Sequence, residues 1–475
     1  MTSTASPPTA TAPPALRGSL GTASIVLMVL AAAAPLSVVG GSVPLGIALG
    51  NGAAFPTAFV VCCVVLLLFA VGFCAMARHV KEAGAFYAYV DQGLGRRAGL
   101  GSAYLALVTY TAIQAAVYGY IGVALDSLVQ SYGGAHLPWW AWAGAVALVV
   151  GVLGHRQVDL SGKVLGVLMV GEVGIVLVLN MAVLVRGGEH GLSTALISPD
   201  RLTSGAPGLA VTFAIAGFLG FEATAVFRGE ARDPDRTIPR ATYLALALVG
   251  VFYALSSWAL ISAWGDKGAV AEARRDPESM LMTTVHRYLG SPAEHLAQVL
   301  FVTSLFACVL SFHHVIARYV HSLADRGALP AGLGRAHARH HSPHAASLAQ
   351  SGSAVVLIAV FALAGMDPIT EVFTWMGGLA SAGVDVLMLL TCVAVVVYFR
   401  RTRSDTRRWQ TLWAPALGGA GLLVLLVLTL LNFPLLIGGS AALASALLGL
   451  LAAAFVLGWA RRHRGTVPAE LPVSA

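Results

Sequence analysis

The chain has 475 residues, of which 57% are hydrophobic and only 11% are charged. A soluble domain carries roughly 25% charged residues, because its whole surface faces water, so this composition excludes a large soluble protein. The net charge of +7 falls on loops between apolar runs, where positive charge reports membrane orientation and not nucleic-acid binding.

Long apolar runs follow one another from residue 24 to residue 460. Residues 1–22 contain a single charge, Arg17, and are expected to form a disordered tail. The run that follows is too long for the apolar core of a signal peptide, which has about 7–15 residues. Because about 20 apolar residues cross a bilayer, we predict an all-α membrane protein of about twelve transmembrane helices. The expected spans are 24–48, 56–78, 99–125, 139–154, 164–186, 209–228, 241–263, 296–322, 347–365, 369–399, 412–432 and 435–459.

The connections between these runs give further expectations. Residues 79–95 are typical of a short amphipathic helix, and a surface helix is expected around 279–289. The run 335–344 mixes four histidines with arginines; a solvated basic loop is favoured there over a metal site. The break Asn432–Phe433–Pro434 predicts a tight hairpin between the last two helices, since proline does not extend a helix smoothly.

The five cysteines all lie inside apolar runs, without metal-ligand spacing, and are expected to be small packing residues. They are Cys62, Cys63, Cys74, Cys308 and Cys392.

The distribution of Lys and Arg predicts the orientation of the chain. With twelve spans, 23 of the 29 basic residues fall on the side that holds both termini, and 6 fall on the other. Loops rich in Lys and Arg stay in the cytoplasm. We therefore predict a multi-pass protein of the cell membrane with both termini in the cytoplasm.

Two of the predicted spans do not have the pattern of an uninterrupted helix. The first contains Pro35-Leu36-Ser37 and then Gly40-Gly41, and the sixth contains Gly217 to Glu222. Proline removes a backbone donor and glycine tolerates non-helical dihedral angles. At membrane depth an unwound backbone is tolerated where it is buried or lines a cavity, and it can bind a ligand there. The alternative is that these glycines only allow close packing.

Three segments carry a resemblance to a known family. They are Gly217–Glu222 with Arg228–Arg240, Ala83–Tyr89 with Gly93–Gly95, and Ala317–Tyr319 with Asp325–Pro330. In their order along the chain they resemble signatures of the amino acid–polyamine–organocation superfamily, in its amino acid permease branch. The resemblance implies a LeuT-like core of two inverted five-helix repeats, followed by two extra helices. The implied division is a tail to residue 22, repeats at 23–186 and 209–399, a helix pair at 411–460 and a tail at 461–475.

The resemblance also implies a substrate site at mid-membrane. On the first helix it falls on Pro35, Leu36 and Ser37, where relatives hold the substrate carboxylate, with Gly40 and Gly41 supplying flexibility. On the third helix it falls on Thr109, Tyr110 and Gln114. The remaining implied positions are Ala216, Gly217, Phe218 and Gly220 on the sixth helix, and Phe312 as an aromatic gate on the eighth. Because none of these side chains is acidic, a neutral or zwitterionic ligand is favoured over a cation.

Ionisable residues at membrane depth are costly and suggest function. Glu172 in the fifth span falls near a position where some proton-coupled relatives carry lysine, and Glu222 matches a family position implicated in proton movement. Both are predicted to couple transport to a proton or sodium ion; the alternative for Glu172 is a protonated, hydrogen-bonded structural residue. Asp385 is expected to be a structural or cavity-lining residue, and His313 to hydrogen-bond to a backbone carbonyl.

The sequence thus predicts a proton-coupled permease for amino acids or related amines that works by alternating access, without a cofactor, metal or nucleic-acid partner. An exchanger and a sodium symporter are the alternatives within this class, and a membrane-embedded amino acid sensor is the alternative outside it. An enzyme is not expected, since the chain contains no HExxH, GxSxG or phosphate-binding glycine motif. The substrate and the oligomeric state are left open.

Overall fold

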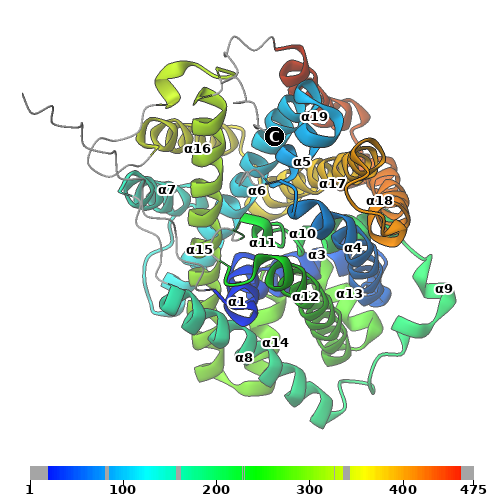
Figure 1. Cartoon of the computed structure of the whole chain (residues 1–475). Coiled ribbons are helices and arrows are strands. Elements are labelled where there is room, and N and C mark those ends of the chain that lie inside the picture. Colours follow the sequence, from blue (N-terminus) through cyan, green and yellow to red (C-terminus); the bar gives the residue numbers. More distant parts are fainter. Residues whose placement is uncertain are drawn as a thin grey trace, which may run out of the picture.

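A computed structural model describes residues 20–80, 85–156, 162–226, 228, 231–325, 327–334 and 343–461. Residues 1–19 of the predicted tail at 1–22, most of the histidine-rich run at 335–344 and nearly all of the C-terminal tail lie outside these ranges. Within them the chain is a bundle of helices (Figure 1).

The elements of the first half run from α1 to α9. They are α1 (Thr22–Ala32), α2 (Pro35–Ser37), the π-helix η1 (Val38–Ser42), α3 (Val43–Leu49), η2 (Gly52–Ala54), α4 (Pro56–Ala77), α5 (Ala85–Leu94), α6 (Arg96–Ser131), α7 (Trp139–His155), α8 (Gly162–Arg186), η3 (Ala195–Ile197) and α9 (Pro199–Leu202).

The second half follows with the elements from α10 to α19. They are α10 (Pro207–Ala216), α11 (Ala223–Val226), α12 (Pro234–Trp264), α13 (Asp266–Arg275), α14 (Met280–Leu289), α15 (Ser291–Asp325), η5 (Ala331–Gly334), α16 (His344–Leu363), η6 (Pro368–Phe373), α17 (Thr374–Thr402), η7 (Trp409–Trp413), α18 (Ala414–Leu436) and α19 (Ala441–Ala460).

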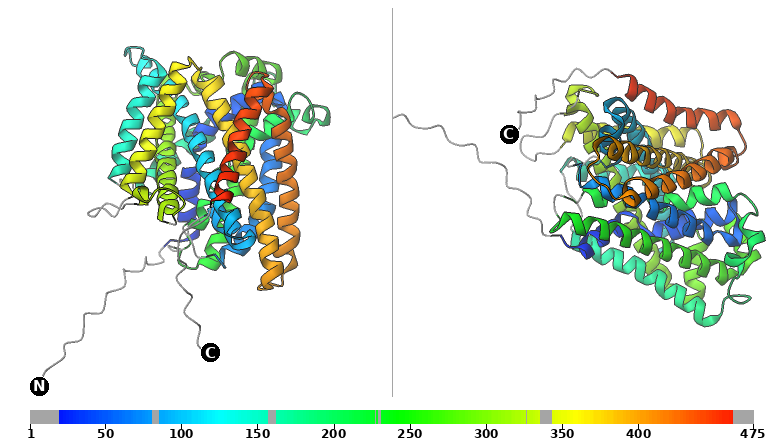
Figure 2. Two further views of the ribbon diagram at one scale, coloured as in Figure 1. Left: turned by 90° about the horizontal axis from the view of Figure 1, so that it is seen from above. Right: turned by 45° about the vertical axis from the view of Figure 1, so that its right-hand side comes forward.

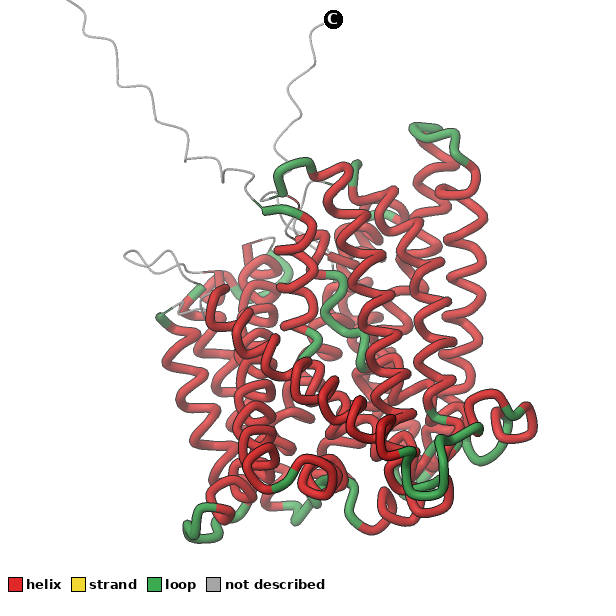
Figure 3. Tube along the Cα trace, turned by 90° about the horizontal axis from the view of Figure 1, so that it is seen from below, coloured by secondary structure: helices red, strands yellow, loops and turns green. Residues whose placement is uncertain are grey.

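The expectation of an all-α membrane protein is confirmed. In the described part of the chain, ten helical segments are long and apolar enough to cross a membrane, and the shorter apolar helices α7 and α10 lie at the fourth and sixth predicted spans. Helix α1 begins and α19 ends at one face of the bundle, which we call the termini face (Figure 2). Short loop segments also lie among the helices (Figure 3).

Two predicted connecting helices are present. Helix α14 lies at the predicted surface helix, and α5 lies within 79–95. Helix α5 is more than a surface element, because Phe86 and Val90 are fully buried and the helix packs against α6 and α17.

The predicted hairpin at Asn432–Pro434 is wrong in its position. Helix α18 continues through Pro434 to Leu436, and the chain reverses at Gly438 and Gly439, whose φ angles are 78° and 89°. Glycine adopts this left-handed conformation without steric cost. The amide of Gly439 donates to the carbonyl of Pro434 at 2.7 Å, so the proline lies inside the last turn of the helix instead of ending it.

Candidate functional site

The first span is interrupted, but directly before Pro35 and not at the predicted residues themselves. Helix α1 ends at Ala32, and Ala34 adopts a left-handed conformation (φ 46°) before α2 begins at Pro35. Pro35 occupies the first turn of α2, where its missing N–H costs no helical hydrogen bond. The unwound residues are therefore Ala33 and Ala34, and Pro35, Leu36 and Ser37 form the start of the second half-helix. The hydroxyl of Tyr253 donates to the carbonyl of Ala33 at 3.2 Å.

Gly40 and Gly41 lie in the π-helix η1, where Gly41 allows a close approach of α6 and Gly40 a close approach of Phe301 on α15. A Cβ atom on Gly41 would lie 2.5 Å from the ring of Tyr120. The hydroxyl of Tyr120 donates to the carbonyl of Gly40 at 2.6 Å. Tyr120 therefore joins this part of the first span to α6.

Gly41→Ala is expected to displace the Tyr120 ring and weaken its bond to Gly40, because the new methyl group overlaps the ring. Overpacking of this kind costs about 1–3 kcal/mol, so the thermal unfolding temperature of the purified protein should fall by several degrees. Gly144→Ala on α7 is the matched control, since nothing lies within 4 Å of its Cβ position and alanine favours a helix. Equal unfolding temperatures for the two variants would contradict this prediction.

The sixth span is interrupted between α10 and α11, as predicted. Residues 217–222 form turns, and Gly220 has a φ of 103°, a conformation that favours glycine. The carboxyl group of Glu222 folds back onto this turn and accepts from the Gly220 amide at 2.9 Å. It also accepts from the hydroxyl of Tyr110 on α6 at 3.1 Å.

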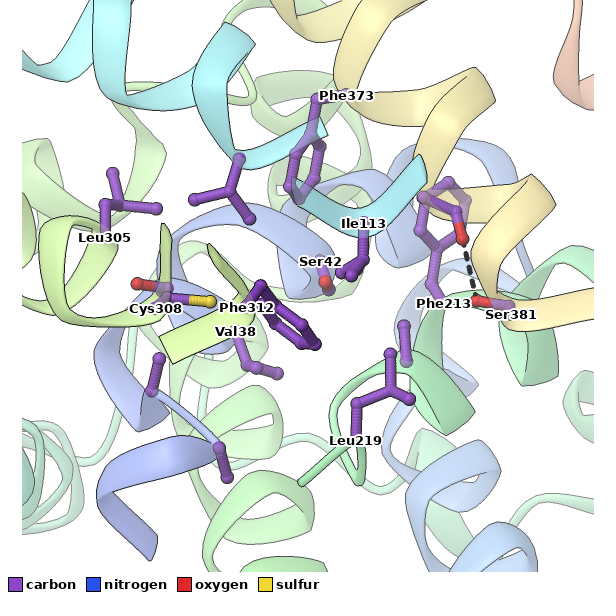
Figure 4. Close-up of a pocket in the computed structure, with 16 residues that line it drawn as sticks. Val38, Ser42, Ile113, Phe213, Leu219, Leu305, Cys308, Phe312, Phe373 and Ser381 are labelled. Carbon is purple, nitrogen blue, oxygen red and sulfur yellow. Dashed lines mark hydrogen bonds between the residues drawn. The ribbon is translucent and has the colours of Figure 1, made fainter. Parts of the chain in front are cut away.

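A cavity of about 70 Å³ lies between the two interrupted spans. Its lining comes from both breaks and from α6, α15 and α17, and it is mostly apolar, with hydroxyl groups from three serines (Figure 4). The lining residues are Ala33, Ala34, Ser37, Val38, Ser42, Ile113, Val117, Phe213, Ala216, Leu219, Leu305, Cys308, Phe312, Phe373, Gly377 and Ser381. None of these side chains is charged.

Three of the predicted substrate residues line this cavity, namely Ser37, Ala216 and Phe312. Gly217 packs behind it, where a Cβ atom would lie 3.0 Å from Val38. Phe218 faces Phe59 and Tyr253 instead.

The predicted residues of the third helix do not line the cavity. The Thr109 hydroxyl donates to its own helix at Leu105, and Tyr110 bonds to Glu222. The amide of Gln114 donates to the carbonyl of Val309 at 3.3 Å and accepts from Gln350, so it joins α6 to α15 and α16. Ile113 and Val117, one turn apart on the same helix, line the cavity; no sequence signal separates these apolar residues from their neighbours.

Glu172 on α8 lies beside the start of the second half-helix. Its side chain is 5% exposed, accepts from the Ser304 hydroxyl at 2.8 Å and lies near the Leu36 amide. The Ser37 hydroxyl donates in turn to Ser304 at 3.1 Å. A carboxylate is favourable at this point, because the first amides of a helix carry partial positive charge. Glu172 thus joins α2, α8 and α15 beside the cavity.

Two further ionisable residues lie at depth. The His313 ring bonds to the Ser347 hydroxyl at 2.9 Å, where a backbone carbonyl was predicted. Asp385 on α17 is fully buried, and neither of its oxygens has a hydrogen-bond partner among the described residues. Nothing in the structure explains why this carboxyl group is unpartnered.

Comparison with known proteins supports a transporter. The chain is 25% identical over 334 residues to a probable GABA permease of Pseudomonas aeruginosa. The match covers 67% of this chain and 66% of the permease, so the chain spans just under two thirds of that relative's length. It is 22% identical over 343 residues to the serine/threonine exchanger SteT of Bacillus subtilis, covering 70% and 72%.

A solved structure has the same fold. The manganese transporter of Eremococcus coleocola, in complex with an aromatic bis-isothiourea substituted compound, superposes with a TM-score of 0.61 at 15% identity, over 92% of each chain. This likeness supports the LeuT-like arrangement that the sequence predicted. The family described as amino acid permease matches residues 20–460, and the chain belongs to this family of membrane transporters, which are not enzymes.

Proposed function

We propose that this protein is a secondary active transporter that couples the uptake of a small neutral amino acid to the movement of protons. The observation that carries the proposal is the arrangement of two interrupted helices around one cavity, with a carboxyl group at each break. Interrupted helices at mid-membrane expose backbone groups that bind substrates and ions. Glu172 and Glu222 supply the groups that can carry a proton.

The cavity favours a zwitterion with a small side chain. Its lining has three serine hydroxyls and otherwise apolar groups, so an uncompensated charge on the substrate side chain would be left without a partner. The two charges of a zwitterion can be met by the backbone at the breaks instead. The named relatives, a probable GABA permease and a serine/threonine exchanger, handle amino acids of this size.

Glu172 offers a route for coupling. The Glu172 carboxyl group lies near the Leu36 amide at the start of α2, where a substrate carboxylate would bind. An ionised carboxylate attracts this amide more strongly than a neutral acid does. Protonation of Glu172 therefore weakens this attraction and removes a negative charge that repels the substrate. In this proposal a proton must be bound before the substrate carboxylate can replace Glu172.

The transport cycle follows from the division into repeats at 23–186 and 209–399, which we retain as part of the proposal. The segments that contain the breaks rock against the remaining helices and open the cavity to each side in turn. The helix pair α18 and α19 lies outside this pair of repeats.

Proteoliposomes loaded at defined pH test the proposal. An inward pH gradient should drive accumulation of a labelled neutral amino acid, and a sodium gradient at equal pH should not. Accumulation with sodium alone would establish the sodium symporter, and movement only against substrate on the other side would establish the exchanger. No movement under any gradient would overturn the transport function.

A thermal-shift screen of the purified protein identifies the substrate. A ligand at 100 times its dissociation constant adds roughly 2.7 kcal/mol to the stability of a two-state protein. Small neutral amino acids are expected to raise the unfolding temperature more than basic or acidic ones.

The distribution of Lys and Arg is the basis for proposing that the termini face lies in the cytoplasm. Cysteine labelling in intact cells tests this orientation. Ser404 and Ser204 are both exposed. Ser404 follows the tenth predicted span, and Ser204 precedes the sixth. Ser204→Cys should react with a membrane-impermeant maleimide added outside, and Ser404→Cys should react only after the cells are opened. The reverse pattern would place the termini outside.

A further inference from the structure

We infer that the connection between α17 and α18 binds the headgroup of an anionic phospholipid at the termini face. Helix α17 ends and α18 begins at this face (Figure 2). The binding residues, which we call the arginine–tryptophan surface, are Arg400, Arg401, Arg403, Arg408, Trp409 and Trp413. The inference rests on the charge of this surface and on its depth in the membrane, and it is independent of the substrate and of the coupling ion.

The connection concentrates positive charge in a short segment. Five arginines lie between residues 400 and 408, against a single acidic residue, Asp405. All five are exposed. Within the described part of the chain, Arg407 is the only one of the five that forms an ion pair, with Asp405 at 2.6 Å. The other four guanidinium groups therefore remain open to an anion, and the planar arginine fork matches the geometry of a phosphate.

The exposed apolar side chains of α18 fix the depth of this surface. Trp413 and Leu435 lie at the two ends of an exposed stripe that includes Leu417 and Val424. The two ends are 22 residues apart, which corresponds to about 33 Å at about 1.5 Å per residue and matches a hydrocarbon thickness of about 30 Å. Trp413 therefore lies where hydrocarbon meets headgroups, the position that tryptophan prefers. The arginines precede it in the chain and lie in the headgroup layer.

A phospholipid fits this surface better than a soluble anion does. Trp409 and Trp413, the first and last residues of η7, are 53% and 57% exposed. A soluble phosphate would contact only the guanidinium groups, whereas a phospholipid also has acyl chains that cover the two indoles. Clusters of basic residues at this level of the membrane bind anionic lipids. A zwitterionic lipid binds more weakly, because its headgroup carries a cation of its own.

Native mass spectrometry of the purified protein in a neutral detergent tests the inference. The probes are phosphatidylglycerol and phosphatidylcholine with the same acyl chains, and the wild type should prefer phosphatidylglycerol. A variant that combines Arg401→Gln, Arg403→Gln and Arg408→Gln should bind phosphatidylglycerol about 100-fold more weakly, since each basic side chain near the membrane surface contributes about fivefold (about 1 kcal/mol). Its thermal unfolding temperature should stay at the wild-type value, because the replaced side chains are exposed.

A second triple variant is the matched control. Arg232→Gln, Arg236→Gln and Arg240→Gln remove the same charge from exposed positions at the start of α12. This segment lies beside the start of α1, since Ala231 pairs with Leu20, and so belongs to the same face. The control variant should keep the wild-type preference for phosphatidylglycerol.

Three results would overturn the inference. Equal binding of the two lipids by the wild type would show that the arginines do not select an anionic headgroup. An equal loss of binding in both triple variants would show that only the total charge of the face matters. Displacement of phosphatidylglycerol by inorganic phosphate at the same concentration would show that the occupant is a soluble anion. None of these results bears on the proposed transport function, which is tested separately.

Discussion

Replacing Glu222 by glutamine is expected to stop pH-driven uptake while substrate exchange continues. Glutamine has nearly the same shape and its carbonyl oxygen can still accept from Tyr110, but it cannot take up or release a proton. Its amide cannot accept from Gly220 as the second carboxyl oxygen does at 2.9 Å, so the turn loses one hydrogen bond. The initial rate of uptake under a pH gradient should fall by roughly 100-fold, the lower end of what a positioned proton-transfer group contributes.

A second measurement and a control variant test whether the effect is specific to proton transfer. Counterflow of labelled substrate at equal pH should stay near the wild-type rate, because no net proton transfer is needed. Glu294→Gln is the matched control, since Glu294 bonds to the partly exposed His286, far along α15 from the cavity. Wild-type pH-driven uptake in Glu222→Gln would rule out this carboxyl group as a proton carrier.

Replacing Glu172 by glutamine is expected to lower the final ratio of substrate concentrations across the membrane. The variant resembles the protonated state permanently, so the substrate carboxylate can reach the Leu36 amide whether or not a proton is present. One coupled proton accumulates substrate about tenfold for a gradient of about one pH unit. The variant should equilibrate substrate to a ratio near 1, at a rate similar to that of the wild type.

The pH dependence of substrate affinity gives an independent readout for Glu172. In the wild type, affinity should fall as pH rises, because the ionised carboxylate holds Leu36 and repels the substrate. In Glu172→Gln this dependence should disappear, with affinity at high pH at least equal to that of the wild type. A variant that still accumulates substrate and keeps the wild-type pH dependence would assign Glu172 a purely structural role. Glu172→Ala should in addition lower thermal stability, because it leaves the buried Ser304 hydroxyl without its acceptor.

The two glutamate predictions differ for a structural reason. Glu222 bonds to Tyr110 and to the Gly220 amide, neither of which lines the cavity, whereas Glu172 bonds to Ser304, which is bonded in turn to Ser37 on the half-helix that would hold the substrate. The first is therefore expected to control how fast protons move, and the second whether their movement is tied to that of the substrate.

Much of the fold could be predicted from the sequence, because the bilayer imposes a length and a polarity on every span. The apolar runs identified the ten long helical segments and the positions of α7 and α10. Glycine also identified the sixth-span break, since Gly220 adopts a conformation that few other residues tolerate.

The same local signals failed where neighbouring helices decide the outcome. Pro434 did not end its helix, and the first break formed at Ala33 and Ala34, just before Pro35 and not at the predicted residues Pro35–Ser37 or Gly40–Gly41. The left-handed Ala34 and the bond from Tyr253 to Ala33, 220 residues apart in the chain, depend on how α12 packs against α1. Local propensity does not contain that information.

What the sequence determined by itself was therefore the membrane class, the family, the approximate spans and the two glutamates placed at membrane depth. The tertiary structure decided which side chains meet: Ile113 and Val117 at the cavity in place of Thr109 and Gln114, Glu172 at Ser304 beside the second half-helix, and Glu222 at Tyr110 and the Gly220 amide. The physical reason is that burial and helix length depend on composition along the chain, whereas cavities and hydrogen bonds depend on helix rotation. Rotation is set by packing between residues far apart in the sequence.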